Sequence, residues 1–216
     1  MKKANQFGET VDGYSIPVLN EREIRAAAGL LFLFTFLSLM FIMFKGEFLM
    51  IKYVITVFMT DFLIRVFIGP KYAPTLILGR LIVRRQTPEY VGAAQKKFAW
   101  IIGVILSVTM FVLMVIVNSY SIITGLICLF CLIFLFFESV FGICLGCLFY
   151  NMFYKEKAQH CPGEICEVKD RHEIQKVTLI QLLVVLAVVA LVVVIGLMFN
   201  DYFSIKPHDL FGSLNH

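Results

Sequence analysis

Long apolar runs constrain this chain more than any other feature of its sequence. A helix needs about 20 predominantly apolar residues to cross a bilayer, and five stretches meet this requirement. A soluble domain is about half apolar and about a quarter charged, whereas this chain is 60% hydrophobic and 16% charged. The sequence therefore predicts an all-α, polytopic membrane helix bundle. The predicted spans cover residues 26–44, 49–68, 98–117, 122–149 and 177–199.

The segments outside these spans complete the predicted organisation. A four-span core covers residues 26–154 and follows an N-terminal segment over 1–25. A basic link over 70–97 and a Cys-containing link over 155–176 are expected on the side of the N-terminus. The fifth span then leads to a tail over 200–216 on the opposite side.

The first long link contains an amphipathic segment between Tyr72 and Arg85. Leucine, isoleucine and valine residues are interspersed there with Arg80, Arg84 and Arg85. This pattern is typical of a basic helix that lies in the membrane interface. The alternative is a helix packed under the bundle with its arginines in water.

Positive residues are distributed unequally between the two sides. Of the 19 lysines and arginines, 15 fall in the N-terminal segment and the two long links, and 3 fall on the other side. Because cytoplasmic connections are enriched in Lys and Arg, we expect the N-terminus in the cytoplasm and the C-terminal tail outside. Topology accounts for these basic residues, so no nucleic-acid partner is expected, and the predicted environment is a lipid bilayer.

Ionisable residues inside the predicted spans are candidates for function. Asp61 and Arg65 lie four residues apart in the second span, so they share one helical face and can pair. Helix direction places Glu138 of the fourth span at a similar depth. We therefore expect a buried cluster of these three residues, because each charge needs a partner in the membrane. The alternative is an architectural clamp between the two spans.

Cysteines are the candidate reactive groups. Cys144 and Cys147 form a Cys-x-x-Cys pair at the expected cytoplasmic boundary, with a glycine beside each. Such a pair can cycle between dithiol and disulfide or carry sulfur, and the alternative is two packed thiols. Cys128 and Cys131 lie in the middle of the fourth span, where free cysteine usually packs as a small hydrophobe.

A second pair of thiols, Cys161 and Cys166, lies in the Cys-containing link. This pair is suited to exchange with Cys144 and Cys147 if the link folds back. The same four cysteines also have spacings that zinc sites use, although Cys144 and Cys147 have apolar neighbours. No cofactor is predicted apart from this zinc alternative.

Three motifs resemble a bacterial integral-membrane family labelled domain of unknown function 4395. They are DFLIRVFIGPKYAP from Asp61 to Pro74, QKKFA from Gln95 to Ala99, and ESVFGICLGCLFY from Glu138 to Tyr150. The resemblance covers roughly residues 13–154 and implies a four-span core in a bacterial cytoplasmic membrane. It implies no established activity. Association of some relatives with thioredoxin-like or rhodanese-like soluble partners favours thiol or sulfur chemistry.

The leading hypothesis is thiol–disulfide or sulfur handling at the cytoplasmic face. Cys144 and Cys147 are the predicted reactive pair, and Cys161 and Cys166 are their predicted exchange partners. A nearby cation favours a thiolate and a nearby carboxylate disfavours it, so the polar cluster would tune the pair. The alternatives are a non-enzymatic membrane scaffold, or accessory subunit, and a small-molecule carrier. Whether the protein is an enzyme stays open.

Overall fold

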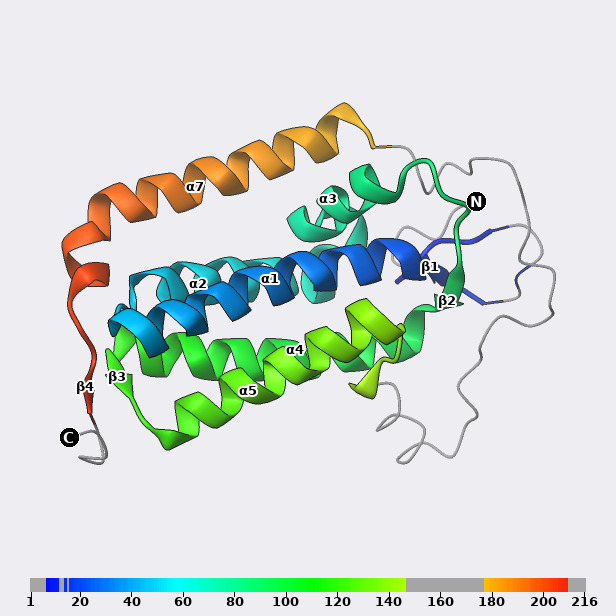
Figure 1. Cartoon of the computed structure of the whole chain (residues 1–216). Helices are drawn as coiled ribbons and strands as arrows, with labels where there is room; N and C mark the ends of the chain where they lie inside the picture. Colours follow the sequence, from blue (N-terminus) through cyan, green and yellow to red (C-terminus); the bar gives the residue numbers. More distant parts are fainter. Residues whose placement is uncertain (1–6, 12–13, 15, 147–176, 210–216) are drawn as a thin grey trace.

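A computed structural model describes residues 7–11, 14, 16–146 and 177–209, which form a bundle of long helices (Figure 1). Within this part of the chain, four helices are long and apolar enough to cross a membrane. The predicted all-α, polytopic helix bundle is therefore confirmed, and the protein is a multi-pass membrane protein. The four helices are α1 (Glu21–Lys45), α4 (Ala93–Phe111) with its π-helical extension η3 (Val112–Ile116), α5 (Ile122–Phe136) with its π-helical extension η4 (Phe137–Phe141), and α7 (Leu179–Ser204).

The second predicted span forms α2 (Leu49–Leu63) and a π-helical turn, η1 (Ile64–Ile68). It carries three charged side chains, and all are almost inaccessible: Lys52, Asp61 and Arg65. Successive long helices run in opposite directions (Figure 1). We call the end that holds the starts of α1, α4 and α7 the N-terminal end of the bundle, and the opposite end the C-terminal end.

Local sequence signals explain where several helices begin and end. The Asn20 side chain accepts a hydrogen bond from the backbone N–H of Arg22 at 3.2 Å, which caps α1. Gly46 ends this helix with φ of 65°, a left-handed conformation that glycine adopts without a steric penalty. Capping boxes start α5 at Ser121 and α7 at Thr178.

Two short strand pairs tie the connections together at the ends of the bundle. At the N-terminal end, β1 (Val18–Asn20) pairs antiparallel with β2 (Tyr90–Gly92). At the C-terminal end, β3 (Ser119–Tyr120) pairs in parallel with β4 (His208–Asp209). The first pair brings the start of α1 beside the start of α4, because each helix follows its strand directly.

Helix α3 (Pro74–Val83) follows a 3-10 turn, η2 (Pro70–Tyr72), and packs closely against α1. A Cβ atom at Gly79 would lie 2.5 Å from the carbonyl oxygen of Glu23, so the two helices approach to backbone contact. A helix forms in this link as expected, but its Arg80 side chain is buried and not exposed. The interfacial position of the helix stays a prediction. The outward face of the helix carries the exposed apolar side chains of Leu78, Leu81 and Ile82. Arg84 and Arg85 are exposed just after the end of the helix.

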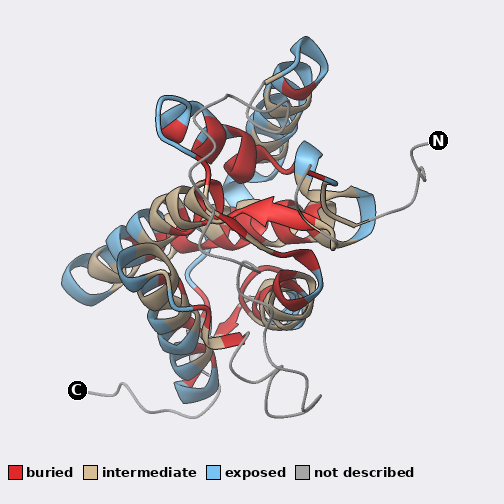
Figure 2. Ribbon diagram, turned by 90° about the vertical axis from the view of Figure 1, so that its right-hand side faces the viewer, coloured by how far each residue is buried: buried red, intermediate tan, exposed pale blue. Residues whose placement is uncertain are grey.

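The core of the bundle is divided between its two ends. Buried side chains from α1, α2, α3, α4 and α5 form the cluster at the N-terminal end, and a smaller cluster from α2, α4 and α5 lies toward the C-terminal end. Figure 2 looks along the bundle and shows buried residues facing inward with exposed ones on the outer faces. Since many of these outer residues are large and apolar, they suit contact with lipid.

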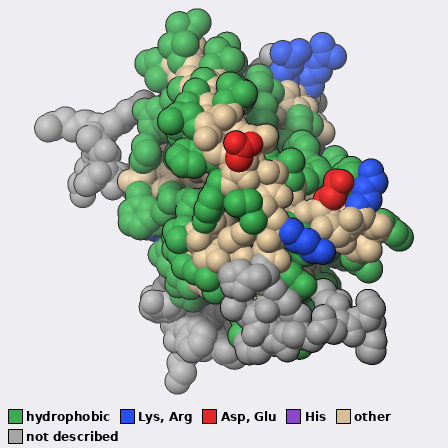
Figure 3. Space-filling view, turned by 90° about the vertical axis from the view of Figure 1, so that its left-hand side faces the viewer, with side chains coloured by type: hydrophobic (Ala, Val, Ile, Leu, Met, Phe, Trp, Pro, Cys, Tyr) green, Lys and Arg blue, Asp and Glu red, His purple; other side chains and the backbone are tan. Residues whose placement is uncertain are grey.

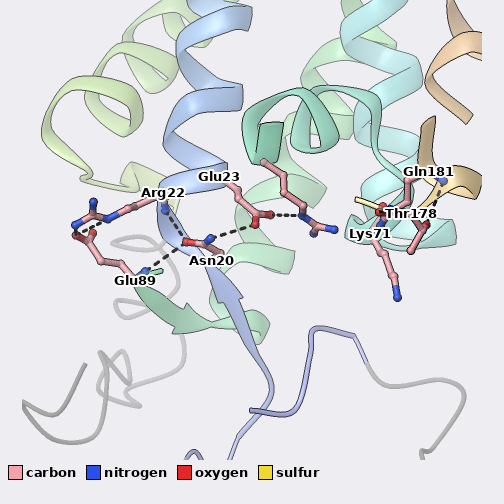
Figure 4. Close-up of polar contacts among 8 residues, drawn as sticks. Asn20, Arg22, Glu23, Lys71, Glu89, Thr178 and Gln181 are labelled. Carbon is pink, nitrogen blue, oxygen red and sulfur yellow. Dashed lines mark hydrogen bonds and ion pairs between the residues drawn. The ribbon is translucent and has the colours of Figure 1, made fainter. Parts of the chain in front are cut away.

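Polar contacts near both ends attach α7 to the rest of the bundle. Near its start, the Gln181 side-chain amide donates to the carbonyl oxygen of Lys71 at 2.8 Å (Figure 4). Near its finish, the buried Lys52 ammonium donates to the carbonyl oxygens of Phe203 and Ile205 at 3.1 and 2.7 Å. A cation favours the carbonyl end of a helix, so Lys52 holds the end of α7 against α2.

Replacing Gly79 by alanine tests the close approach of α1 and α3. The new methyl group would meet backbone atoms that cannot turn aside, so we expect a loss of about 1–3 kcal/mol in stability. The matched control is Gly125→Ala on exposed α5, where nothing lies within 4 Å of the added atom. Thermal unfolding of the two variants in detergent measures the difference, and equal melting temperatures would contradict this packing.

Candidate functional site

A cavity of about 60 Å³ lies between α1, α2, α4 and α5 near the N-terminal end of the bundle. Most of its wall is apolar, but three of the residues singled out from the sequence line it together. The side chains relevant to chemistry in this wall are Arg65, Trp100, Cys131, Glu138 and Cys144. We take this cavity, called the inner cavity below, as the candidate site.

Arg65 is held in place by a buried network between α2 and α3. Its Nε atom donates to Asp61 Oδ2 at 2.7 Å, and its Nη2 atom donates to the Thr75 hydroxyl at 2.6 Å. Asp61 also accepts from the backbone N–H and the hydroxyl of Thr75, at 2.8 and 2.7 Å. The guanidinium lies 4.5 Å from the ring centre of Phe62 and 5.1 Å from that of Trp100, which are cation–π distances. The Asp61 carboxylate therefore caps α3 while it fixes Arg65.

Glu138 has a different partner from the one expected. It lies on η4, and its Oε1 atom is 2.5 Å from the Nζ atom of Lys96 near the start of α4. The same ammonium lies 2.8 Å from Glu21 Oε2 on α1. The expected cluster of three thus forms two neighbouring groups, one around Arg65 and one around Lys96, and the inner cavity touches both. Lys96 was counted only as a topological charge in the sequence, yet its side chain is 1% exposed.

The start of α1 supplies further ion pairs to this end of the bundle. Glu23 accepts from Arg80 of α3 at 3.1 Å and from the Asn20 side chain at 3.1 Å, and both contacts are buried. Arg22 pairs with Glu89, which precedes β2, in a more exposed position. Figure 4 shows Asn20, Arg22, Glu23 and Glu89 gathered at the first turn of α1. Consecutive residues of one helix turn therefore reach three different segments.

Cys144 lies on a non-helical segment rather than on the predicted fourth helix. The helix of this span ends at Phe141, because Gly142 takes a left-handed conformation with φ of 68°. Helical residues begin again at Leu145, after Cys144. Arg25 donates to the carbonyl oxygen of Val140 at 3.1 Å and holds this turn against α1. The resulting bend places Cys144, which is 8% exposed, in the wall of the inner cavity.

The other predicted thiols are divided between the described and undescribed parts of the chain. Cys147, Cys161 and Cys166 lie outside the described residues, so their exchange and the zinc alternative stay predictions. Among the described residues, no group of three or more His, Cys, Asp or Glu side chains could hold a metal ion. Cys131 also lines the inner cavity. From the sequence alone, this residue was expected only to pack as a small hydrophobe.

Comparison with known proteins identifies one family. The family model described as domain of unknown function (DUF4395) matches residues 19–155, which is more than half of the chain. No curated protein and no solved structure matches the sequence. The matched range includes every charged residue that borders the inner cavity, and it ends before the fifth predicted span.

Replacing Lys96 by methionine tests the buried group around it. Two carboxylates, Glu21 and Glu138, would lose their shared cation, so we expect a loss of about 3–5 kcal/mol in stability. Arg22→Met is the control, because the more exposed pair with Glu89 contributes only about 0–1 kcal/mol. Unfolding in detergent would show the difference. A Lys96 variant as stable as the Arg22 variant would contradict a shared ion pair.

Proposed function

This chain belongs to the family of the domain of unknown function DUF4395, and we propose that it exchanges dithiols and disulfides with a soluble protein at the N-terminal end of its bundle. Cys144 and Cys147 are the proposed reacting pair. One observation carries the proposal: Cys144 lies in the wall of the inner cavity together with Arg65 and Glu138. A thiol that shares a cavity wall with a fixed cation suits thiol chemistry, because a nearby positive charge favours the thiolate.

The surroundings of Cys144 suit a thiol that must lose a proton and become a thiolate. Arg65 cannot swing away from the cavity without breaking its contacts with Asp61 and Thr75. Glu138 is compensated by Lys96, so its negative charge is partly offset where it faces the cavity. A thiolate formed at Cys144 would therefore share the cavity wall with a positioned guanidinium and with a carboxylate whose charge is partly offset.

The proposed exchange follows ordinary disulfide chemistry. A thiolate of the pair attacks a disulfide of the partner, forms a mixed disulfide and releases one partner thiolate. The second thiolate of the pair then attacks the mixed disulfide, which leaves the Cys144–Cys147 disulfide and a fully reduced partner. Two electrons pass to the partner, and the two protons lost by the pair balance those that the partner thiolates take up. A thioredoxin-like protein has the matching dithiol chemistry, and Cys161 and Cys166 are the proposed intermediate pair.

A structural scaffold is the second candidate, and a specific observation favours it. Every charged side chain identified at the inner cavity has a partner of opposite charge within the described residues: Arg65 with Asp61, and Glu138 with Lys96. Such a closed set holds helices together without performing chemistry. The two candidates differ in whether Cys144 ever changes its redox state.

We also propose that the protein lies in a bacterial cytoplasmic membrane with the N-terminal end of the bundle in the cytoplasm. The unequal distribution of Lys and Arg supports this orientation. Figure 3 views the C-terminal end, where few charged side chains interrupt a largely apolar surface. In this orientation Cys144 lies at the end of the bundle next to the reducing compartment, where lasting structural disulfides are rare.

Reporter fusions test the orientation. Alkaline phosphatase fused after His216 should be active, because it folds only outside the cytoplasm, and a fluorescent protein fused there should stay dark. Insertion of the same reporters after Gln86, in an exposed segment between α3 and β2, should give the reverse result. Matching signals at both sites, or inverted ones, would overturn the proposed orientation.

Trapping of a mixed disulfide tests the proposed exchange. The Cys147→Ser and Cys144→Ser variants should each leave one thiol of the pair unable to complete the reaction. At least one of them should therefore accumulate a covalent adduct with a thioredoxin-like protein. The adduct should appear on non-reducing gels of whole membranes, disappear with reductant and be identifiable by mass spectrometry.

Two comparisons make this result specific. The double variant Cys144→Ser/Cys147→Ser should form no adduct, although it retains the other four cysteines. Maleimide labelling of the wild-type protein, with and without reductant, should show that Cys144 and Cys147 exist in both redox states in cells. If both stay reduced and no variant traps a partner, the exchange proposal fails and the scaffold remains.

A further inference from the structure

A second cavity, of about 30 Å³, lies deeper in the bundle between α1, α2, α4 and α5. It is called the middle cavity below. A cavity needs about 10–15 Å³ of such volume to hold one water molecule, so there is room for a small guest. No charged residue lines it, and its lining combines aliphatic and aromatic side chains with sulfur and hydroxyl groups. The residues that matter here are Thr35, Ser107, Met110, Cys128 and Cys131.

Three sulfur-bearing side chains line the middle cavity. Cys128 and Cys131 are three residues apart on α5 and so share a face of that helix. Met110 comes from α4, and both it and Cys128 are buried, at 3% and 7% exposure. We propose that the middle cavity is a Cu(I) site, with the thiols of Cys128 and Cys131 and the thioether of Met110 as ligands.

The donor set selects for a soft ion. Thiolate and thioether sulfur favour Cu(I), whereas carboxylate, carbonyl and water oxygens favour harder cations. Zn²⁺ ordinarily takes four nitrogen, sulfur or oxygen ligands, and the middle cavity presents no imidazole or carboxylate among its lining residues. A low-coordinate, all-sulfur site therefore fits Cu(I) better than the commoner divalent ions.

The binding step releases protons. Cysteine ligates a metal as the thiolate, so Cys128 and Cys131 each lose a proton and each form one copper–sulfur bond. The Met110 thioether binds through a lone pair and loses no proton. Two protons therefore leave for each Cu(I) ion that enters, and binding should tighten as the pH rises.

Thr35 provides an independent indication that the cavity receives a guest. Its hydroxyl is buried, lines the cavity and has no hydrogen-bond partner among the described residues. Leaving such a group unpaired costs about 1–3 kcal/mol. A coordinated thiolate is a stronger acceptor than a thiol, so metal binding would give this hydroxyl a partner.

The inner cavity offers an entry route for the ion. Phe58 and Cys131 line both cavities, so the two spaces adjoin across these shared side chains. A metal site needs such a path as well as ligands. The proposed copper site does not depend on thiol exchange, because its three ligands exclude Cys144 and Cys147.

Copper titration of a simplified chain tests the proposal. The background is the full chain with Cys144, Cys147, Cys161 and Cys166 all replaced by serine, purified anaerobically in detergent. Cu(I) is supplied as its coloured bicinchoninate complex. Transfer of copper from this complex to the protein is measured as loss of the colour of the complex. We expect about one Cu(I) per chain, with a shell of sulfur neighbours in X-ray absorption.

Substitutions then assign the ligands. Cys128→Ala and Cys131→Ala should each abolish binding. Met110→Leu should weaken copper binding by more than about 10-fold. Loss of a residue that only hydrogen-bonds to a metal ligand already lowers metal affinity by at least this factor, and Met110 is proposed to bind the ion directly. Met198→Leu is the matched control, because Met198 is 72% exposed on α7 and should change nothing.

The outcomes separate cleanly. Copper bound in the background chain and lost with either cysteine supports the site, whatever the result for thiol exchange. Copper that is not bound, or that survives both cysteine substitutions, overturns it. The X-ray absorption measurement needs no substitution at the middle cavity, so it decides the question even if a ligand variant fails to fold.

Discussion

Buried charge at the N-terminal end of the bundle determines how the helices meet there. A charged group away from water is tolerated only when it is paired and hydrogen-bonded. Glu21 and Glu23 on α1 each need a cation, and α4 and α3 supply Lys96 and Arg80. The register of three helices thus follows from a single turn of α1. The same requirement turns η4 so that Glu138 meets Lys96, which places the following residues, Cys144 included, beside the inner cavity.

Much of the fold could be predicted because bilayer crossing is a requirement of length and composition. Apolar runs identify long helices without any knowledge of their partners, and the spacing of Asp61 and Arg65 was enough to predict their contact. The partner of Glu138 could not be found this way, because several cations lie near the same depth. The choice of Lys96 depends on how α4 is rotated about its axis, and α4 begins directly after β2, the strand that pairs with β1.

The site differed from expectation where single residues override a regular pattern. A left-handed Gly142 ends the helical run before Cys144, and an apolar sequence gives no signal of whether a glycine will end a helix or remain inside one. Gly79 had a comparable effect, since it allows α3 to contact α1 so closely that Arg80 reaches Glu23. The arginines of this segment therefore have two roles: Arg80 forms a buried ion pair, whereas Arg84 and Arg85 are exposed at the surface. Both differences, at Gly142 and at Gly79, arise from backbone geometry, which cannot be predicted from amino-acid composition.

The polar contacts at the two ends of the bundle explain why cavities persist between them. In a membrane, lipid chains are as apolar as leucine, so no hydrophobic force draws the helices together to fill a void. Near one end Asp61, Arg65 and Lys96 fix the helices, and near the other Lys52 joins α2 to the end of α7. The helices between these points are held at a set spacing, and buried, mostly apolar side chains pack the middle. Space next to Cys128 and Cys131 can then remain open, which a collapsing soluble core would not allow.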